Sequence, residues 1–178
     1  MALAISNKFI KILSFNFMLI MGKAIKYGDN INTDVIYPGR YLDIIDAEEM
    51  AKHAMEDLDS NFLEKVKKAN IIVAGKNFGC GSSREQAATC LKYAGIDAII
   101  AKSFARIFFR NAINNGILVV ECEYTDEIND GDELKIDANN GEIFDATNKK
   151  KFKIDPLPEF LMKIIEAGGL INYVKGRI

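Results

Sequence analysis

The sequence has a single histidine and only three cysteines among its 178 residues, and these shortages exclude several kinds of site. His53 lies in a charged stretch typical of an exposed helix, so we predict a surface residue and no Ser–His pair of a hydrolase. The cysteines, Cys80, Cys90 and Cys122, are odd in number and widely spaced. They indicate neither a disulfide framework nor a C-x-x-C metal site, and no metal-binding residue is predicted in this chain.

Charge of one sign is not in excess either. Lysine and arginine number 23 against 25 aspartate and glutamate, and the net charge is −2. The charges are interspersed without a basic stripe, which argues against nucleic acid as a partner. A chain of this length with 49% hydrophobic residues predicts one α/β domain with a real core.

The first twenty residues depart from this globular pattern. The apolar run 9–20 imitates the hydrophobic part of a signal peptide, but it is too short and too interrupted to span a bilayer, and no A-x-A-like cleavage site follows. We therefore expect no membrane partner. Residues 1–20 are expected to be a non-native or disordered extension, with translation starting at Met18 or Met21, and residues 21–178 to form a single domain.

Hydrophobic periodicity and turn residues predict an alternation of strands and helices. Strands are expected at residues 22–27, 71–74, 97–101, 117–121 and 133–137. Helices are expected at residues 47–55, 61–68, 83–93, 103–115 and 158–167. Asp46 and Ser60 are predicted as N-caps, and Gly95 as a C-cap.

The most informative segment is N-F-G-C-G-S-S-R-E-Q at residues 77–86, directly after the apolar run Ile71–Ala74. A strand followed by two glycines and two hydroxyls predicts a tight turn and a helix start. Two overlapping S-x-x-[EQ] capping boxes begin at Ser82 and Ser83. Backbone N–H groups at a helix start favour an anion, and the planar fork of Arg84 matches carboxylate or phosphate.

This loop departs from two familiar motifs. A phosphate loop requires G-x-x-x-x-G-K-[ST], but Ser82 follows Gly81 and no lysine comes next. A hydrolase elbow requires G-x-S-x-G, whereas Arg84 and Glu85 follow the two serines. A well-capped helix without chemistry is the remaining alternative, and the combination of two glycines with an arginine disfavours it.

Three motifs carry a resemblance to a known family: the loop at 77–86, D-N-I-N-T-D at 29–34 and K-S-F-A-R-I at 102–107. In this order they resemble the swivelling domain of the aconitase family. The match runs from about Gly22 to Val174, and a chain limited to this domain is similar to the separate small subunits of 3-isopropylmalate dehydratase and of homoaconitase-type enzymes. The resemblance implies a three-layer β/β/α domain with a mixed sheet, as in the C-terminal domain of aconitase.

The resemblance also implies the activity and its partners. It implies a cytoplasmic hydro-lyase of leucine biosynthesis that works only with a large subunit, as a heterodimer or heterotetramer. The substrate is a small hydroxy-dicarboxylic acid, which loses water and regains it with the hydroxyl on the adjacent carbon. The 4Fe–4S cluster of the reaction is held by the large subunit, and no cofactor is expected on this chain.

By the same resemblance, Ser82 removes the C–H proton as an alkoxide, and Asp34 is a second catalytic residue. For Asp34 a turn-stabilising role is an equal alternative. Gly81, Ser83 and Arg84 are implied to hold a substrate carboxylate. A helix end contributes at most about 2 kcal/mol, far too little to ionise a serine near pH 7. Arg84 and a substrate-bound partner must supply the rest, so the subunit alone is expected to be inert.

Further residues concern substrate binding and choice. Arg106 shares a helix face with Arg110 and is a secondary binding residue, with a structural ion pair as the alternative. Asp43 follows Tyr41-Leu42, where homoaconitase-type subunits carry an arginine, and an acid there repels a distal carboxylate. Ile44 and Ile45 could pack on an isopropyl group, whose burial contributes about 1.5–3 kcal/mol.

These residues favour 3-isopropylmalate as the substrate. Gln86 points the other way, because isopropylmalate-type subunits often carry histidine there and homoaconitase-type relatives carry glutamine. Homoaconitate and 2,3-dimethylmalate therefore stay open as substrates. A different class of function, a module that binds an anionic metabolite without turnover, is the second alternative.

Overall fold

The computed structural model describes residues 2–6, 9–14 and 17–176. Its centre is a nine-stranded mixed sheet in the order β6-β5-β4-β3-β7-β8-β9, and β2 and then β1 extend from β3. The strands are β1 (Ala2–Ser6), β2 (Phe9–Ser14), β3 (Phe17–Lys26), β4 (Ile71–Ala74), β5 (Ala98–Ala101), β6 (Leu118–Glu121), β7 (Glu133–Asp137), β8 (Glu142–Asp145) and β9 (Lys150–Lys153). The helices are α1 (Thr33–Ile36), α2 (Ala47–Ala51), α3 (Phe62–Lys65), α4 (Gln86–Ala94), α5 (Arg106–Asn114), α6 (Glu159–Glu166) and α7 (Leu170–Lys175), with 3₁₀ turns η1 (Gly39–Tyr41) and η2 (Glu123–Glu127).

Strand β3 belongs to both halves of the sheet. Its last residues pair in parallel with β4, whereas its middle pairs antiparallel with β7. Strands β4, β5 and β6 are also parallel and are buried almost throughout, as expected for a parallel sheet covered on both faces. In β7, buried Leu134 and Ile136 alternate with exposed neighbours. The carboxyl ends of β3, β4, β5 and β6 therefore meet at one edge of the parallel half.

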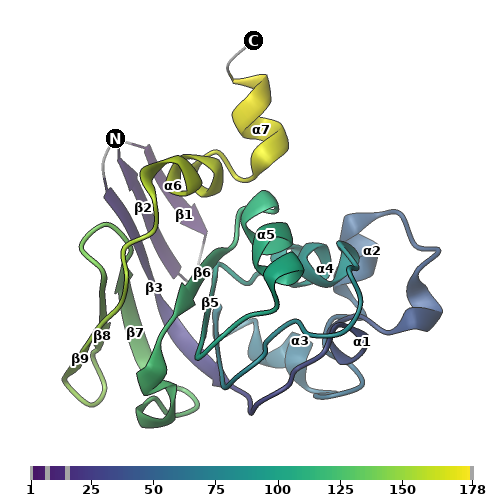
Figure 1. Cartoon of the computed structure of the whole chain (residues 1–178), viewed down its shortest axis with the longest axis horizontal. Coiled ribbons are helices and arrows are strands. Elements are labelled where there is room, and N and C mark those ends of the chain that lie inside the picture. Colours follow the sequence, from purple (N-terminus) through teal and green to yellow (C-terminus); the bar gives the residue numbers. More distant parts are fainter. Residues whose placement is uncertain (1, 7–8, 15–16, 177–178) are drawn as a thin grey trace.

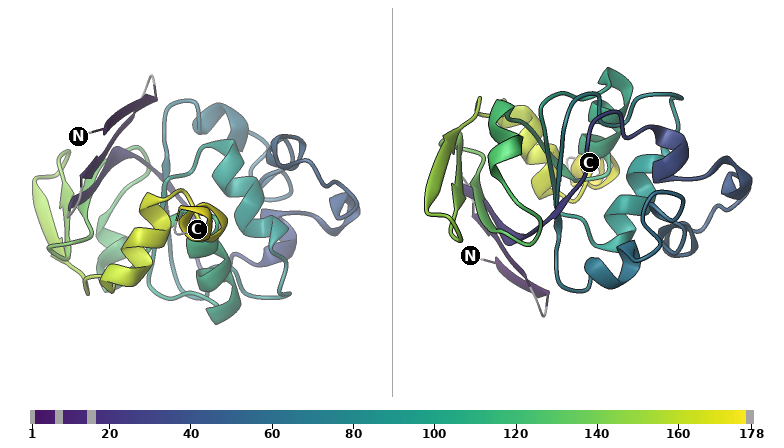
Figure 2. Two further views of the ribbon diagram at one scale, coloured as in Figure 1. Left: turned by 90° about the horizontal axis from the view of Figure 1, so that it is seen from above. Right: turned by 90° about the horizontal axis from the view of Figure 1, so that it is seen from below.

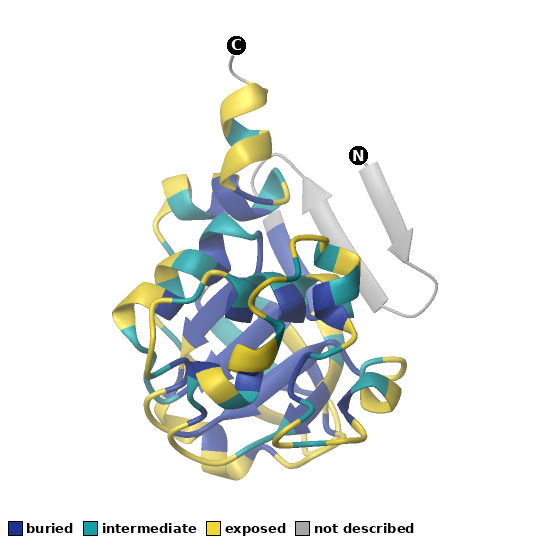
Figure 3. Cartoon of the chain, turned by 90° about the vertical axis from the view of Figure 1, so that its right-hand side faces the viewer, coloured by how far each residue is buried: buried dark blue, intermediate teal, exposed yellow. Residues whose placement is uncertain are grey.

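The two halves of the sheet give the molecule two distinct ends. Strands β7 to β9 lie at one end, and the segment from α1 to α3 lies at the other (Figures 1 and 2). Helices α4 and α5 bury one face each, α4 through Cys90 and Leu91 and α5 through Phe108 and Ile113. The buried strands lie inside, and the outer faces of the helices are exposed (Figure 3). The α/β class with a mixed sheet, expected from the sequence, is confirmed.

Most predicted elements are present with shorter bounds. The strand at 133–137, the cap Asp46 and the left-handed C-cap Gly95 are confirmed. The predicted cap Ser60 is wrong, because α3 begins after Asn61, whose side chain makes no capping bond. His53 is half-buried, and its ring stacks on Tyr41 with centroids 3.7 Å apart, so the prediction of a plain surface residue is also wrong.

The predicted boundary at residue 21 falls inside β3. Met18 and Ile20 are fully buried, and Leu19 and Ile20 pair with β7, so the sheet includes residues upstream of Met21. The backbone of β1 and β2 continues the sheet by antiparallel pairing. The non-native origin of residues 1–20 stays a prediction. Among the described residues, no helix has both the length and the apolar character needed to cross a membrane.

Candidate active site

The three sequence motifs meet at the carboxyl edge of the parallel strands. The loop after β3 pairs with the loop after β4 through an isolated bridge between Asn32 and Cys80, and the Gly79 N–H donates to Ile31 O at 2.7 Å. The loop after β4 in turn bridges Phe104 in the loop after β5. Ligands of open α/β sheets bind outside the carboxyl ends of parallel strands. The motifs therefore form one candidate site from three distant parts of the chain.

Two glycines allow these loops to approach closely. Gly79 has φ = 77° and Gly81 has φ = 101°, both in the region that favours glycine. A Cβ on Gly79 would lie 2.1 Å from Cγ of Phe108, and one on Gly81 would lie 3.0 Å from Thr33 Oγ1. Directly before Gly79, the buried ring of Phe78 holds the junction of strand and loop, and its centroid lies 5.2 Å from that of Phe108.

Ser82 is exposed, and its backbone N–H and side chain both contact the buried hydroxyl of Thr33. The Ser82 N–H donates to Thr33 Oγ1 at 3.0 Å, and the two side-chain oxygens are 3.1 Å apart. Thr33 is only 1% exposed, and its own N–H donates to Cys80 O at 2.7 Å. The Ser82 hydroxyl is therefore accessible on one side and supported by a buried hydroxyl on the other.

Arg84 is held by the turn that follows Thr33. Its guanidinium pairs with Asp34 and donates to Tyr37 O at 3.3 Å, and a Cβ on Gly39 would lie 3.4 Å from its Nη2. The Arg84 side chain is 21% exposed and that of Asp34 is 62% exposed. Asn32 fixes the turn by accepting from the N–H groups of Asp34 and the next residue at 2.9 and 3.0 Å. Asp34 and Arg84 thus lie side by side, beside Ser82 and Ser83.

The predicted capping boxes at Ser82 and Ser83 are wrong. Helix α4 begins at Gln86, and Glu85 at its N-cap makes no side-chain capping bond. The Ser82 N–H bonds to Thr33 instead, because Thr33 lies within reach across the two loops. Ser82 is therefore four residues before the helix, where the field of the helix end is weaker than a cap position would receive.

The loop that carries Asp43 and Ile44 follows η1. Asp43 is exposed, whereas Ile44 is half-buried and packs against the core, with its N–H donating to Tyr41 O at 3.0 Å. Ile45 is the apolar side chain that this loop presents outward, at 91% exposure. The turn η1 before this loop adjoins the serine motif at Gly39, where an added Cβ would lie 3.4 Å from Arg84 Nη2.

A cluster of charged and aromatic groups anchors this loop to the segment between α2 and α3. Arg40 pairs with Glu56 and Asp57, and its guanidinium lies 4.8 Å from the centroid of the Tyr41 ring. The hydrogen bond from Arg40 lowers the pKa of Asp57. Burial acts to raise the pKa of Glu56, but hydrogen bonds from His53, Tyr41 and Arg40 outweigh it and the pKa is lowered. Both carboxylates therefore stay ionised and hold the loop near neutral pH.

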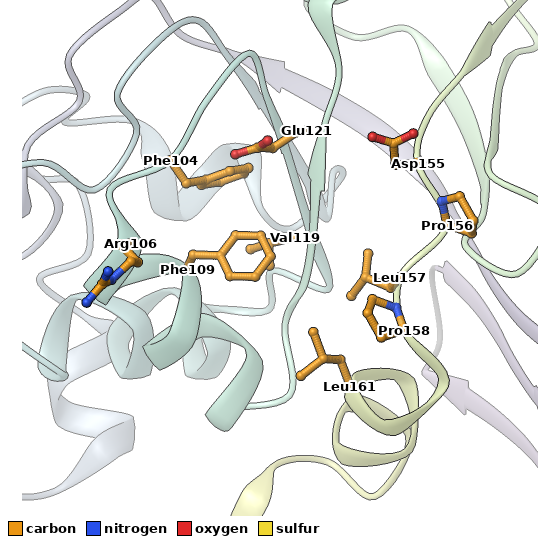
Figure 4. Close-up of a pocket in the computed structure, with 10 residues that line it drawn as sticks. All are labelled: Phe104, Arg106, Phe109, Val119, Glu121, Asp155, Pro156, Leu157, Pro158 and Leu161. Atoms are coloured by element: carbon orange, nitrogen blue, oxygen red, sulfur yellow. The ribbon is translucent and has the colours of Figure 1, made fainter.

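Arg106 directly follows Ala105, whose N–H donates to Phe78 O at 2.9 Å. Arg106 is exposed at the start of α5 and borders a cavity of about 340 Å³, whose described lining does not include Ser82, Asp34 or Arg84. The cavity is lined by Phe104, Arg106, Phe109, Val119, Glu121, Asp155, Pro156, Leu157, Pro158 and Leu161. The guanidinium points away from the apolar side chains of this cavity (Figure 4). A substrate contact by Arg106 stays a prediction.

Within residues 2–6, 9–14 and 17–176, no three His, Cys, Asp or Glu side chains converge as metal ligands. Cys90 and Cys122 are buried, and burial raises the pKa of both thiols, which disfavours the thiolate that binds metals. Cys80 is half-buried and lies alone in the glycine loop. The described donor set does not fit an iron–sulfur cluster.

Comparison with known proteins agrees with these motifs. Residues 20–125 match the Aconitase C-terminal domain family. The chain is 57% identical over 162 residues to the 3-isopropylmalate dehydratase small subunit of Caldicellulosiruptor bescii, covering 90% of this chain and 98% of that protein. The chain belongs to the 3-isopropylmalate dehydratase small-subunit family.

Other members of this small-subunit family support the same assignment. The 3-isopropylmalate dehydratase small subunit 1 of Archaeoglobus fulgidus is 56% identical over 155 residues, which cover 87% of this chain and 96% of that one. The crystal structure of a 3-isopropylmalate dehydratase from Methanocaldococcus jannaschii superposes with a TM-score of 0.84 at 51% identity, covering 90% of this chain and 95% of that one. The predicted family is confirmed.

Sequence reasoning missed Thr33 and Tyr37 as partners of the serine motif. Both lie in or just after the N-T-D segment that was noticed only for Asp34. The hydroxyl of Thr33, directly before Asp34, was the sequence feature that could have indicated this contact. The contact itself follows from the pairing of two loops more than forty residues apart, which local sequence does not reveal.

Proposed function

We propose that this chain is the small subunit of a 3-isopropylmalate dehydratase. With a large subunit it interconverts 3-isopropylmalate and 2-isopropylmalate by dehydration and rehydration, a step of leucine biosynthesis in the cytoplasm. One observation carries the proposal. The exposed Ser82 contacts Thr33, the neighbouring Arg84 pairs with Asp34 in the same turn, and the chain belongs to this family. The relatives compared above share one name, so homoaconitate, 2,3-dimethylmalate and a non-catalytic module are less favoured.

The reaction requires a base and an anion site, and the serine motif offers both. Ser82 accepts the proton from the substrate carbon, and the fork of Arg84 binds a substrate carboxylate with two parallel hydrogen bonds. Gly81 and Ser83 flank that carboxylate. When the large subunit is bound, its 4Fe–4S cluster supplies a Lewis-acidic iron for the leaving hydroxyl. This division of labour explains why each subunit would be inert alone.

Asp34 is proposed to orient Arg84 rather than to transfer a proton. Its carboxylate pairs with one side of the guanidinium, while Tyr37 O accepts from the same nitrogen, Nη1. Those two contacts fix the plane of the fork and leave other N–H groups for a substrate carboxylate. Because Asp34 is mostly exposed, an approaching substrate can compete for the same arginine.

Replacing Arg84 with lysine tests the anion site. Arg84→Lys keeps the charge and loses the bidentate fork, so KM for 3-isopropylmalate is expected to rise about tenfold or more with kcat less affected. Steady-state kinetics of the assembled enzyme measures this. Arg110→Lys, on the exposed face of α5, is the matched control and should leave KM unchanged. A change in KM below about threefold for Arg84→Lys would make Arg84 a structural ion pair, worth under about 1 kcal/mol.

Asp43 tests the choice of substrate. If the loop after η1 reads the group on the distal carbon, Asp43→Arg replaces a repulsive acid with a fork that pairs with a carboxylate. The ratio of kcat/KM for homoaconitate over 3-isopropylmalate is then expected to rise about 100-fold. Glu48→Arg makes the same charge change at an exposed position of α2 and controls for a general field effect.

The outcome for Asp43 is read as a ratio, so expression or assembly losses cancel. A ratio that stays within about threefold of wild type would show that this loop does not select the substrate. Ile44 would then keep only its packing role against the core.

A substrate panel tests the proposed function itself. The chain is assembled anaerobically with the large subunit, and kcat/KM is measured for 3-isopropylmalate, homoaconitate and 2,3-dimethylmalate. We expect a preference for 3-isopropylmalate of about 100-fold, within the roughly 10- to 200-fold discrimination that an apolar pocket achieves without editing. Faster turnover of either other acid would reassign the substrate within the same reaction class.

A further inference from the structure

We propose that Thr33 is a positioning residue whose buried hydroxyl donates a hydrogen bond to Ser82 Oγ. This inference rests on the proposed role of Ser82 as the proton acceptor. It assigns a task to a residue outside the Ser-Ser-Arg motif, on the neighbouring loop. The evidence is the 3.1 Å separation of the two hydroxyl oxygens and the burial of Thr33.

The direction of the hydrogen bond between Thr33 and Ser82 follows from which acceptor is available to each hydroxyl proton. Thr33 Oγ1 has one proton and two lone pairs, and one lone pair already accepts from the Ser82 N–H at 3.0 Å. Thr33 is 1% exposed, so its proton requires a protein acceptor, and Ser82 Oγ lies beside it. Ser82 is exposed and can direct its own proton outward. Thr33 is therefore the donor and Ser82 Oγ the acceptor.

This arrangement favours the reactive form of Ser82. A hydrogen bond donated to an anion stabilises that anion, and it becomes stronger than a bond between neutral groups. In the dehydration step, the substrate C–H bond breaks, its electron pair forms the carbon–carbon double bond, and the hydroxyl leaves from the neighbouring carbon. The proton ends on Ser82 Oγ. Thr33 keeps its own proton throughout, so its contribution is orientation and stabilisation of charge.

The support for Thr33 does not depend on its hydroxyl. Its backbone N–H donates to Cys80 O at 2.7 Å, and its carbonyl accepts from the Tyr37 N–H at 3.0 Å. Its position in the first turn of α1 is capped by Asn32. The glycine at position 81 gives the hydroxyl room, because a Cβ there would lie 3.0 Å from it. A shape-matched residue without the hydroxyl should therefore occupy the same place.

Thr33→Val in the assembled enzyme is the central test. It keeps the shape but removes the Thr33 hydroxyl, which is both the donor to Ser82 Oγ and the acceptor of the Ser82 N–H. We therefore expect kcat to fall about 10- to 100-fold while KM stays within about threefold. The pH at which kcat is half-maximal should rise by about one unit or more, because the anionic form of Ser82 loses a donor. Thr33→Ser keeps the hydroxyl and should restore both kcat and the pH profile.

Thr125→Val is the matched control, since Thr125 is equally buried at 1% and lies away from the serine motif, in η2. It should leave the pH profile of kcat unchanged. An unshifted profile in Thr33→Val, or a Thr33→Ser enzyme as impaired as Thr33→Val, would overturn the inference. If Thr33→Val does not assemble, Thr33→Cys decides, because its weak S–H donor should shift the profile in the same direction.

Ser82→Ala separates this inference from the function on which it rests. If Ser82→Ala is inactive and Thr33→Val behaves as wild type, only the role of Thr33 fails. If Ser82→Ala retains about a tenth of kcat or more, Ser82 is not the base and both claims fail together.

Discussion

Ser82→Ala is expected to lower kcat of the assembled enzyme by a factor of about 10³ to 10⁴, because it removes the only group proposed to take the C–H proton. Folding and subunit association should survive, since the Ser82 side chain is exposed and its backbone N–H still bonds to Thr33. The thermal midpoint of the variant and its co-purification with the large subunit check this.

Ser60→Ala is the control for Ser82→Ala. Ser60 is an exposed serine in the turn before α3, outside the site, and its replacement should leave kcat as in wild type. A Ser82→Ala enzyme that keeps about a tenth of kcat would show that another group removes the proton.

Gly79→Ala is expected to destabilise the fold by at least about 3 kcal/mol. Alanine at a positive φ costs roughly 1–2 kcal/mol by itself, and here its Cβ would also lie 2.1 Å from the buried ring of Phe108. Phe108 is 2% exposed and cannot move aside without disturbing its contact with Phe78. Urea unfolding of the isolated subunit measures the change.

Gly95→Ala separates the backbone cost from the steric cost. Gly95 also has a positive φ of 108°, but nothing lies within 4 Å of the Cβ that would be added. Its replacement should therefore cost only about 1–2 kcal/mol. If Gly79→Ala proves no more destabilising than Gly95→Ala, the close approach of the loop to Phe108 is not the reason that position 79 requires glycine.

The parallel half of the fold was predictable because its signals are local. The apolar runs at Ile71–Ala74 and Leu118–Glu121 are long enough to read as buried strands, and Gly95 ends the helix between them as its sequence position indicates. The hairpin β8–β9 escaped prediction because β9 reads Lys150-Lys151-Phe152-Lys153, with a single apolar side chain facing the core.

The sequence indicates which residues form the site, but it does not indicate which of them contact one another. Gly81, Ser82 and Arg84 stood out by residue type, and the structure brings them beside Asp34. The predicted start of α4 is too early because Ser82 and Ser83 have the residue type of N-caps. The partner that Ser82 bonds instead, Thr33, is distant in sequence. Asp43 and Arg106 follow from motif position alone, and their roles await the experiments above.

Reconstitution from separate subunits tests the central claim most directly. This chain and the cluster-bearing large subunit are purified anaerobically, and the interconversion of 3-isopropylmalate and 2-isopropylmalate is followed with each subunit alone and with the two mixed. We expect no turnover from either subunit alone and full activity on mixing, lost again when this chain carries Ser82→Ala. Turnover by the large subunit without this chain, or a mixture that stays inactive with an intact cluster, would contradict the account.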